Sequence, residues 1–165
     1  MVVNFRGNMR FFNPEEYQAF NEKLFLRYKS KIEEVLPDAR VEHIGASSIP
    51  KAISKGDLDI FVGVDATELD SNVQRLMTLG FQEKVDTLRT LELCMLESDS
   101  VEYVAIQVVA NGSEFEFFLS FRDALRSDAM LVQQYNELKL SCEGLSQGAY
   151  RQKKSAFINR VLLQM

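Results

Sequence analysis

Apolar residues recur every three or four positions in the first part of the chain, which is the period of one face of an amphipathic helix. They form a single predicted stripe at Tyr17, Phe20, Leu24, Tyr28, Ile32 and Val35. Asn13 precedes Pro14, and Glu16 follows Asn13 by three residues, which is a capping box with Pro at the first helical position. The pattern therefore predicts a long helix that begins at Pro14 and is ended by Pro37.

The middle of the chain carries the patterns of strands. Residues 40–44 predict a short strand, and the mostly apolar run 58–64 predicts a buried central strand. A second capping box at 65–68 opens a predicted helix that Gly80 closes. The segments 81–86, 88–97 and 101–109 are predicted strands, and the polar turn at 97–100 makes the last two a hairpin.

The remainder of the chain is predicted to be helical. A third capping box at 113–116 is followed by predicted helices at 114–126, 128–142 and 147–163. This order of elements predicts an α+β fold with one mixed β-sheet, helices on one face and a helical C-terminal segment. With 165 residues and 46% apolar residues, we expect one domain, residues 1–165, with a core at about 14–112 and a helical part at about 113–165.

Charge and cysteine content narrow the function classes. The net charge of −5 argues against a protein that binds duplex nucleic acid, because such proteins carry a broad basic face. No apolar run reaches the ~18–20 residues of a membrane span, so no membrane partner is expected. Cys94 and Cys142 lack metal-site spacing and predict two buried free thiols in a reducing cytoplasm. Nothing in the sequence specifies an oligomeric state.

Two aspartates, Asp57 and Asp59, stand at the start of the predicted central strand. Alternate residues of a strand share a face, so their Cα atoms are expected ~6.5–7 Å apart on the same side. Carboxylates held so close repel each other unless a cation lies between them. Mg²⁺ suits the pair, with Mn²⁺ as the alternative, because one or two carboxylates plus substrate phosphates often hold it. The turn at 45–50 just upstream offers backbone N–H groups and two serine hydroxyls to an anion.

Each of these features also has a purely structural interpretation. A D-x-D sequence at a strand start is often only a turn and cap, and Ser47 and Ser48 are good N-cap residues. His43 is the single histidine of the chain, and we expect it to be packed and hydrogen-bonded rather than to act as a catalytic base.

Three separated motifs resemble those of the GrpB family, which is related to the nucleotidyltransferases of the DNA polymerase β superfamily. VEHIGASSIP, followed by a lysine and DIFVGV, is similar to the family pattern EHIGSTSVPGL with its later DILVGV strand. FRDALRSDAMLVQQYNELKLS and AYRQKKSAFINRVL resemble two later family segments. The resemblance covers nearly the whole chain and implies a nucleotidyltransferase-like α+β core. Family members also occur fused to dephospho-CoA kinase.

The resemblance also implies a set of site residues. They are Asp57 and Asp59 as catalytic metal ligands, with nucleotide or phosphate contacts from Gly45, Ser47, Ser48, Lys55, Arg122, Arg126, Lys139 and Lys154, and with Asp123 beside Arg122. For any single lysine or arginine, a solvated helix face is the alternative. Tyr135 and Tyr150 have helical spacing, so each either stacks on a base or packs in the core.

The chain departs from the family pattern at several positions. Ala46 replaces the serine of the Gly-Ser pair, and Lys51 replaces a glycine. The family segment HLHVV aligns with residues 105–109, which include Gln107. The resemblance implies that the third carboxylate of the superfamily belongs on a strand in this region. Glu92 and Glu102 are the nearby acidic alternatives.

Three functions are consistent with the sequence. The first is a Mg²⁺-dependent transfer of a nucleotidyl group from a nucleoside triphosphate to an unknown acceptor. The second is a non-catalytic module that binds a nucleotide or a coenzyme A precursor. The third is an interaction domain. The basic residues near the C-terminus fit a phosphate ligand and an acidic partner equally well; they are Arg151, Lys153, Lys154 and Arg160.

Overall fold

The computed structural model describes residues 10–165, and residues 1–9 of the predicted single domain lie outside the described part. The helices are α1 (Pro14–Val35), α2 (Leu69–Met77), α3 (Phe117–Arg126), α4 (Ala129–Ser141) and α5 (Gln147–Leu163). The strands are β1 (Arg40–Ile44), β2 (Leu58–Val64), β3 (Phe81–Glu83), β4 (Leu93–Ser98) and β5 (Val104–Ala110). Short 3₁₀ turns precede β2, α2 and α3.

The five strands form one mixed sheet in the order β1-β2-β5-β4-β3. The central pair β2 and β5 is parallel, and every other pair is antiparallel. The α+β class, the single mixed sheet and the β4–β5 hairpin are therefore confirmed. The predicted strands 81–86 and 88–97 are too long, because residues 84–92 form an irregular connection between β3 and β4.

Helix α1 begins and ends as its sequence predicts. The Asn13 backbone N–H donates to Glu16 Oε1 at 3.1 Å, and the helix ends two residues before Pro37. One member of the predicted stripe is wrong, because Phe20 is 59% exposed whereas Phe25 is buried. The buried face of α1 is therefore rotated slightly from the predicted stripe. Phe25 on this face stacks on the His43 ring, with the ring centroids 4.8 Å apart.

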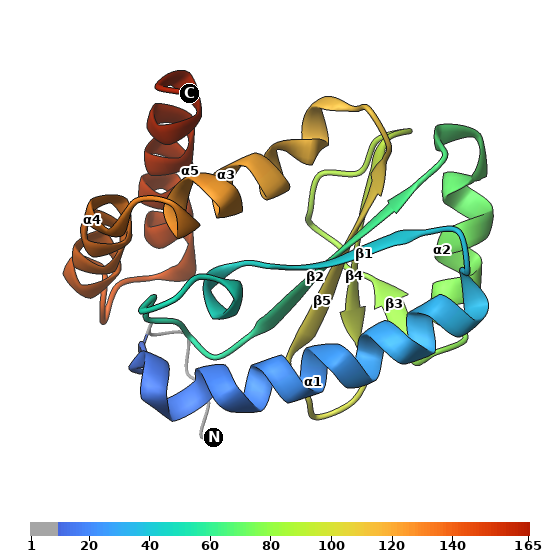
Figure 1. Cartoon of the computed structure of the whole chain (residues 1–165), viewed down its shortest axis with the longest axis horizontal. Coiled ribbons are helices and arrows are strands. Elements are labelled where there is room, and N and C mark those ends of the chain that lie inside the picture. The colour runs from blue at the N-terminus through green and yellow to red at the C-terminus, as the bar shows by residue number, and fades with distance from the viewer. Residues whose placement is uncertain (1–9) are drawn as a thin grey trace.

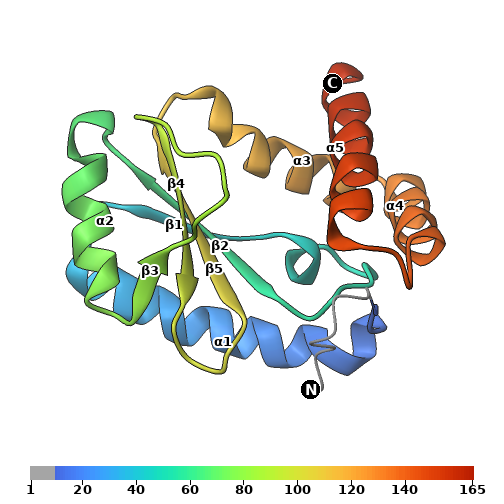
Figure 2. The ribbon, with the colours of Figure 1, turned by 180° about the vertical axis from the view of Figure 1, so that it is seen from behind.

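The two faces of the sheet are covered by different helices (Figure 1). Ile60 and Val62 point into a core with α1 and α2, as predicted for helices on one face. Between them, Phe61 points to the opposite face and packs with Phe115 of the 3₁₀ turn before α3 and with Leu119 of α3. The helical C-terminal part thus reaches over the second face at one end of the sheet, as Figure 2 shows from behind.

The helices α3, α4 and α5 enclose a second core that includes part of the loop after β1. Ile49 and Ala52 of that loop pack with Tyr135 and Phe157. Cys94 and Cys142 are free and buried, as predicted. Across residues 10–165, every helix is too short or too polar to cross a membrane.

Candidate functional site

A cavity of about 460 Å³ opens where the loop after β1, the start of β2 and the helices α3 to α5 meet. Six of the predicted metal-binding and phosphate-binding residues line it: Gly45, Lys55, Asp57, Asp59, Lys139 and Lys154. They come from segments more than 100 residues apart in the chain, so only the fold brings them together. The cavity is therefore the place where the predicted carboxylates and cations can act on one ligand.

Asp57 and Asp59 lie on the same wall of the cavity at the beginning of β2. The Asp57 side chain is 40% exposed, whereas Asp59 is partly buried between Ile44 of β1 and Ala105 of β5. Burial, followed by the negative charge of Asp57, raises the pKa of Asp59 to about 6. The two carboxylates thus repel each other on this wall of the cavity.

Gly45 leaves β1 directly beside Asp59. Its backbone has φ 73° and ψ −175°, a conformation that is essentially restricted to glycine. An added Cβ would overlap Asp59 Oδ2 and lie 2.9 Å from the Asp59 Cβ. The glycine therefore lets the turn approach the carboxylate as closely as backbone atoms can.

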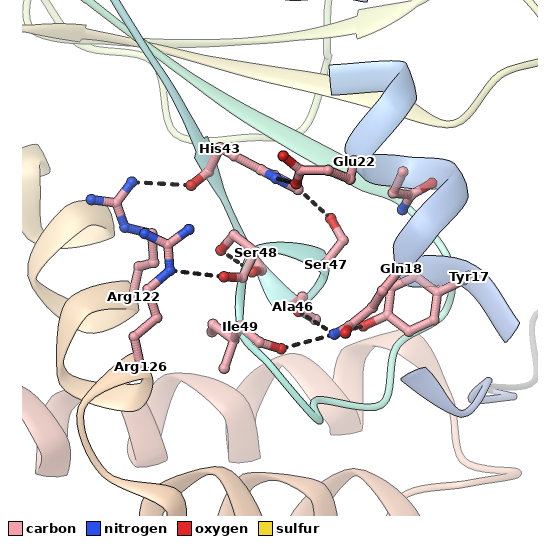
Figure 3. Close-up of polar contacts among 12 residues, drawn as sticks. Tyr17, Gln18, Glu22, His43, Ala46, Ser47, Ser48, Ile49, Arg122 and Arg126 are labelled. Atoms are coloured by element: carbon pink, nitrogen blue, oxygen red, sulfur yellow. Dashed lines mark hydrogen bonds and ion pairs between the residues drawn. The ribbon is translucent and has the colours of Figure 1, made fainter. Parts of the chain in front are cut away.

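The two serine hydroxyls of the turn are directed to protein partners rather than to the cavity. Ser48 Oγ donates to the Gly45 carbonyl at 2.6 Å. Ser47 Oγ lies 2.7 Å from Nε2 of His43, whose Nδ1 is 3.2 Å from Glu22 Oε2 (Figure 3). Neither serine lines the cavity, so a phosphate contact from either would require its hydroxyl to rotate away from these partners.

His43 is a packed histidine, as expected. It is buried, and burial lowers the pKa of its imidazole despite the nearby Glu22 carboxylate. Its contacts to Ser47 and to the Phe25 ring fix the start of the turn.

Arg122 and Arg126 hold the outer side of the turn. Arg122 Nη1 donates to the His43 carbonyl at 3.1 Å and lies 2.9 Å from Glu42 Oε1, and its other nitrogens bind Asp123. Arg126 Nε donates to the Ser48 carbonyl at 2.8 Å (Figure 3). Neither arginine lines the cavity. The structure thus places both arginines behind the turn, and their predicted contact with phosphates stays a prediction.

Side chains of α1 bind the backbone of the loop that leads to Asp57. Gln18 Nε2 donates to the Ile49 carbonyl at 2.8 Å, and the Tyr17 hydroxyl donates to the Ala52 carbonyl at 2.7 Å. Asn21 Nδ2 donates to the Asp57 carbonyl at 3.2 Å. These buried contacts give an otherwise irregular segment its backbone partners.

Helix α4 binds the same loop from the other side. Asn136 accepts from the Ile53 N–H at 3.0 Å and donates to the Lys51 carbonyl at 2.9 Å. Lys139 Nζ donates to the Ile53 carbonyl at 2.6 Å. Lys51 itself has φ 68°, the left-handed conformation that explains a glycine at this position in the family pattern.

Three lysines from three elements surround the carboxylates. Lys55 Nζ is 4.0 Å from Asp57 Oδ2. Lys139 is almost fully buried, with its ammonium 4.0 Å from the centroid of the Tyr135 ring, and burial holds the pKa of Lys139 well below its usual range. Burial also acts to lower the pKa of Lys154, but the Tyr150 hydroxyl and the carboxylates of Asp59 and Asp57 reverse this, and the pKa is raised.

The strand next to β2 supplies no third carboxylate. β5 pairs in parallel with β2 and places Ala105 beside Asp59 and Gln107 beside Phe61. Glu102 binds Arg27 and Tyr28 of α1, and Glu92 lies at the start of β4 outside the cavity lining. Among residues 10–165, no group of three or more histidine, cysteine, aspartate or glutamate side chains is placed to hold a metal.

Aromatic side chains form the rest of the wall. Tyr135 and Tyr150 are both buried and both line the cavity, and Tyr135 stacks on Phe157 at 5.1 Å, so core packing accounts for most of their surface. The sequence patterns did not indicate Phe117, Phe118 and Phe121, which also line the cavity. The aromatic residues in EFEFFLSF occupy more positions than one buried face of a helix can hold, and this excess is the signal that could have revealed them.

The basic residues near the C-terminus divide between two surfaces. Arg151 and Lys154 line the cavity. Lys153 is exposed on α5, and Arg160 donates to Gln134 Oε1 at 3.3 Å, outside the cavity lining.

Comparison with known proteins finds a family model, sequence relatives and solved structures that the chain resembles. A family model described as GrpB protein matches residues 15–164. A UPF0157 protein of Vibrio cholerae is 64% identical over 157 residues, which are 95% of this chain and 84% of the relative. The crystal structure of conserved protein GrpB from Enterococcus faecalis matches with a TM-score of 0.71 at 20% identity, over 92% of this chain and 94% of that one. A structure of Cid1 poly(U) polymerase with MgGTP matches with a TM-score of 0.49 at 18% identity, over 69% of this chain and 39% of that one.

Proposed function

This chain belongs to the GrpB family, and we propose that it transfers a nucleotidyl group from a nucleoside triphosphate, with Mg²⁺, to an unknown acceptor. The observation that carries the proposal is the meeting of the carboxylate pair Asp57 and Asp59 with the lysines Lys55, Lys139 and Lys154 around one cavity. Carboxylates and cations in one cavity suit a ligand that brings both a divalent metal and phosphates.

The donor set fits Mg²⁺ that arrives with its nucleotide. Two carboxylates without a third protein ligand are sufficient when substrate phosphates complete the coordination. The repulsion that contributes to the raised pKa of Asp59 is the second indication, because a bound cation would relieve it. When bound, Mg²⁺ neutralises charge on the phosphates during transfer.

The residues of the chain then have separate tasks. Asp57 and Asp59 hold the metal. Lys154 and Lys55 reach the cavity from α5 and from the loop before β2, so they bind the phosphates of the leaving pyrophosphate. Gly45 lets the backbone of the turn pack directly against the Asp59 side chain, which helps to hold this carboxylate in place.

A nucleotide should stabilise the protein only when Mg²⁺ is present. At ~100 times its dissociation constant, a ligand adds ~2.7 kcal/mol to the free energy of unfolding, which raises the Tm of a chain of this size by several degrees. We expect this shift with at least one of ATP, CTP, GTP and UTP in Mg²⁺, and its loss in EDTA. The absence of a shift with all four nucleotides would contradict the proposal.

Lys154→Gln should weaken the Mg²⁺-nucleotide complex by about 10- to 100-fold, the cost of losing a charge-assisted hydrogen bond to phosphate. Lys153→Gln is the matched control, because Lys153 is the preceding residue of α5 and points to solvent. Isothermal titration with the nucleotide found above measures both. Equal affinities for the two variants would show that Lys154 does not contact the phosphates.

A second function, nucleotide binding without transfer, is favoured by one observation. β5 presents Ala105 and Gln107 where a third carboxylate would assist the attacking hydroxyl. This alternative predicts a nucleotide-dependent Tm shift that persists in EDTA and no release of pyrophosphate. Measuring pyrophosphate together with the Tm separates the two functions.

A further inference from the structure

The cavity extends beyond Asp59 onto the strands that lie away from the lysines. β5 and β4 pair so that Gln107 is opposite Met95, and both side chains line the cavity. Lys84, Asp86, Thr87 and Leu88 of the β3–β4 connection line it as well. Figure 1 shows α4 and α5 at one end of the molecule and β3 toward the other. The cavity therefore has a lysine end and a strand end, with the carboxylates between them.

The proposed transfer requires an in-line displacement at the α-phosphate, with the attacking and leaving oxygens on opposite sides. In the proposed function, Lys55 and Lys154 of the lysine end bind the leaving pyrophosphate. The attacking hydroxyl must then approach from the strand end. This step depends on the proposed function, since it uses the direction in which pyrophosphate leaves.

The strand end has a mainly apolar character. Phe117 and Phe118 stack with centroids 4.3 Å apart and pack with the sheet cluster of Phe61 and Leu93, whereas Phe121 contacts Tyr135 in the helical core. Leu88 lines the cavity although it is 61% exposed. An exposed leucine and two stacked phenylalanines that line one cavity are suited to cover a flat apolar group.

Among the described residues, the strand end of the cavity carries no unpaired positive charge. Lys84 Nζ is 3.2 Å from Glu97 Oε2, and Asp86 adds a further negative charge. A nucleic-acid strand would require unpaired cations along its path. The pairing of Lys84 with Glu97 thus disfavours a polyanionic acceptor and favours a small molecule with little charge.

We propose that the strand end, formed by Phe117, Phe118, Leu88, Met95 and Gln107, is the acceptor subsite and takes a small, flat, apolar molecule that carries a hydroxyl group. The hydroxyl oxygen forms a bond to the α-phosphorus, and the bond from that phosphorus to the bridging oxygen breaks. Pyrophosphate leaves with the electron pair of that bond. The hydroxyl proton is released to solvent.

The test uses 2-naphthol as the probe, a flat apolar molecule with one hydroxyl. Its binding to the full chain is measured by saturation-transfer NMR, with and without Mg²⁺ and the α,β-methylene analogue of the nucleotide that stabilises the protein. Leu88→Ser and Phe118→Leu are the test variants. Leu91→Ser is the matched control, because Leu91 belongs to the same connection, is 85% exposed and does not line the cavity.

We expect 2-naphthol to bind in the presence of the analogue, with a dissociation constant raised about 5- to 10-fold in both test variants and unchanged in Leu91→Ser. The affinity for the analogue should be unchanged in all three. Competition between 2-naphthol and the analogue would assign the aromatic wall to the nucleobase and overturn the proposal. The proposal would also be overturned if 2-naphthol did not bind, or if the test variants bound it as tightly as the wild type. If 2-naphthol binds but no nucleotide does, the proposed function fails and the acceptor role fails with it, while an apolar ligand site remains.

Discussion

Asp59→Asn should abolish nucleotidyl transfer and, at the same time, stabilise the fold. Loss of one of only two carboxylate ligands removes several kcal/mol of charge stabilisation in the transition state, so pyrophosphate release should fall by about 10²–10⁴-fold. The assay is pyrophosphate release in Mg²⁺, with water as the acceptor when no other is added. Wild-type activity in this variant would refute the mechanism.

The stabilising effect follows from the pKa of Asp59, which is about 6 in the folded chain against an ordinary value of 3.8. Between these pH values the folded chain keeps a proton that the unfolded chain has released, so the free energy of unfolding falls as the pH rises through this window. An asparagine has no carboxyl group, so it does not titrate in this window and the variant does not lose stability there. Without metal, the variant should therefore be more stable above pH 6 by about 1–3 kcal/mol, and this advantage should vanish below about pH 4.

Thermal unfolding in EDTA at pH 4 and pH 7 measures this difference, which corresponds to a rise in Tm of roughly 2–8 °C at pH 7. Asp38→Asn is the control, because Asp38 is an exposed carboxylate on the connection between α1 and β1. A stability gain alone is also expected of an interaction domain that has no ligand. Only the gain together with the loss of nucleotide-dependent activity identifies Asp59 as a metal ligand.

Gly45→Ala should be among the most damaging single-methyl substitutions in the chain. The backbone conformation of Gly45 costs any other residue about 1–3 kcal/mol, and the new Cβ would also overlap the Asp59 carboxylate. Relieving that overlap adds a cost of similar size. We expect the free energy of unfolding to fall by about 2–5 kcal/mol and Mg²⁺-dependent nucleotide binding to be lost, because Asp59 must move.

Gly112→Ala is the matched control for backbone strain. Gly112 has φ 82°, but nothing lies within 4 Å of an added Cβ. Its substitution should cost about 1 kcal/mol and leave nucleotide binding intact. Urea unfolding and calorimetric titration of the two variants separate strain from overlap. Equal losses in both would show that the approach of the turn to Asp59 does not organise the site.

The sequence by itself determined the elements whose signals are local. The capping box at Asn13 and Glu16 defined the start of α1, and the apolar run 58–64 defined β2 to the residue. The mixed sheet followed from the order of these elements. The connection at 84–92 was misjudged because its scattered apolar residues, such as Leu88 and Leu91, resemble a strand but are exposed in the fold.

The candidate site also has features that the sequence predicts and features that it does not. The approach of Asp57 and Asp59 to each other was predictable, because two residues of one strand share a face whatever surrounds them. The roles of Ser48 and Arg126 were not, since both are decided by backbone carbonyls of a turn whose path the sequence does not specify.

Only the tertiary structure decided which cations meet the carboxylates. Lys154 enters the cavity and its neighbour Lys153 faces solvent, although both lie in the same basic stretch of α5. The difference depends on how α5 packs against α3 and α4, and that packing comes from contacts such as Tyr135 on Phe157. A helix presents every side of its surface to some neighbour, and its sequence period does not say which neighbour is a site. The chain thus encodes the carboxylates locally, whereas the lysine end and the strand end of the cavity arise from the packing of helices and strands distant in sequence.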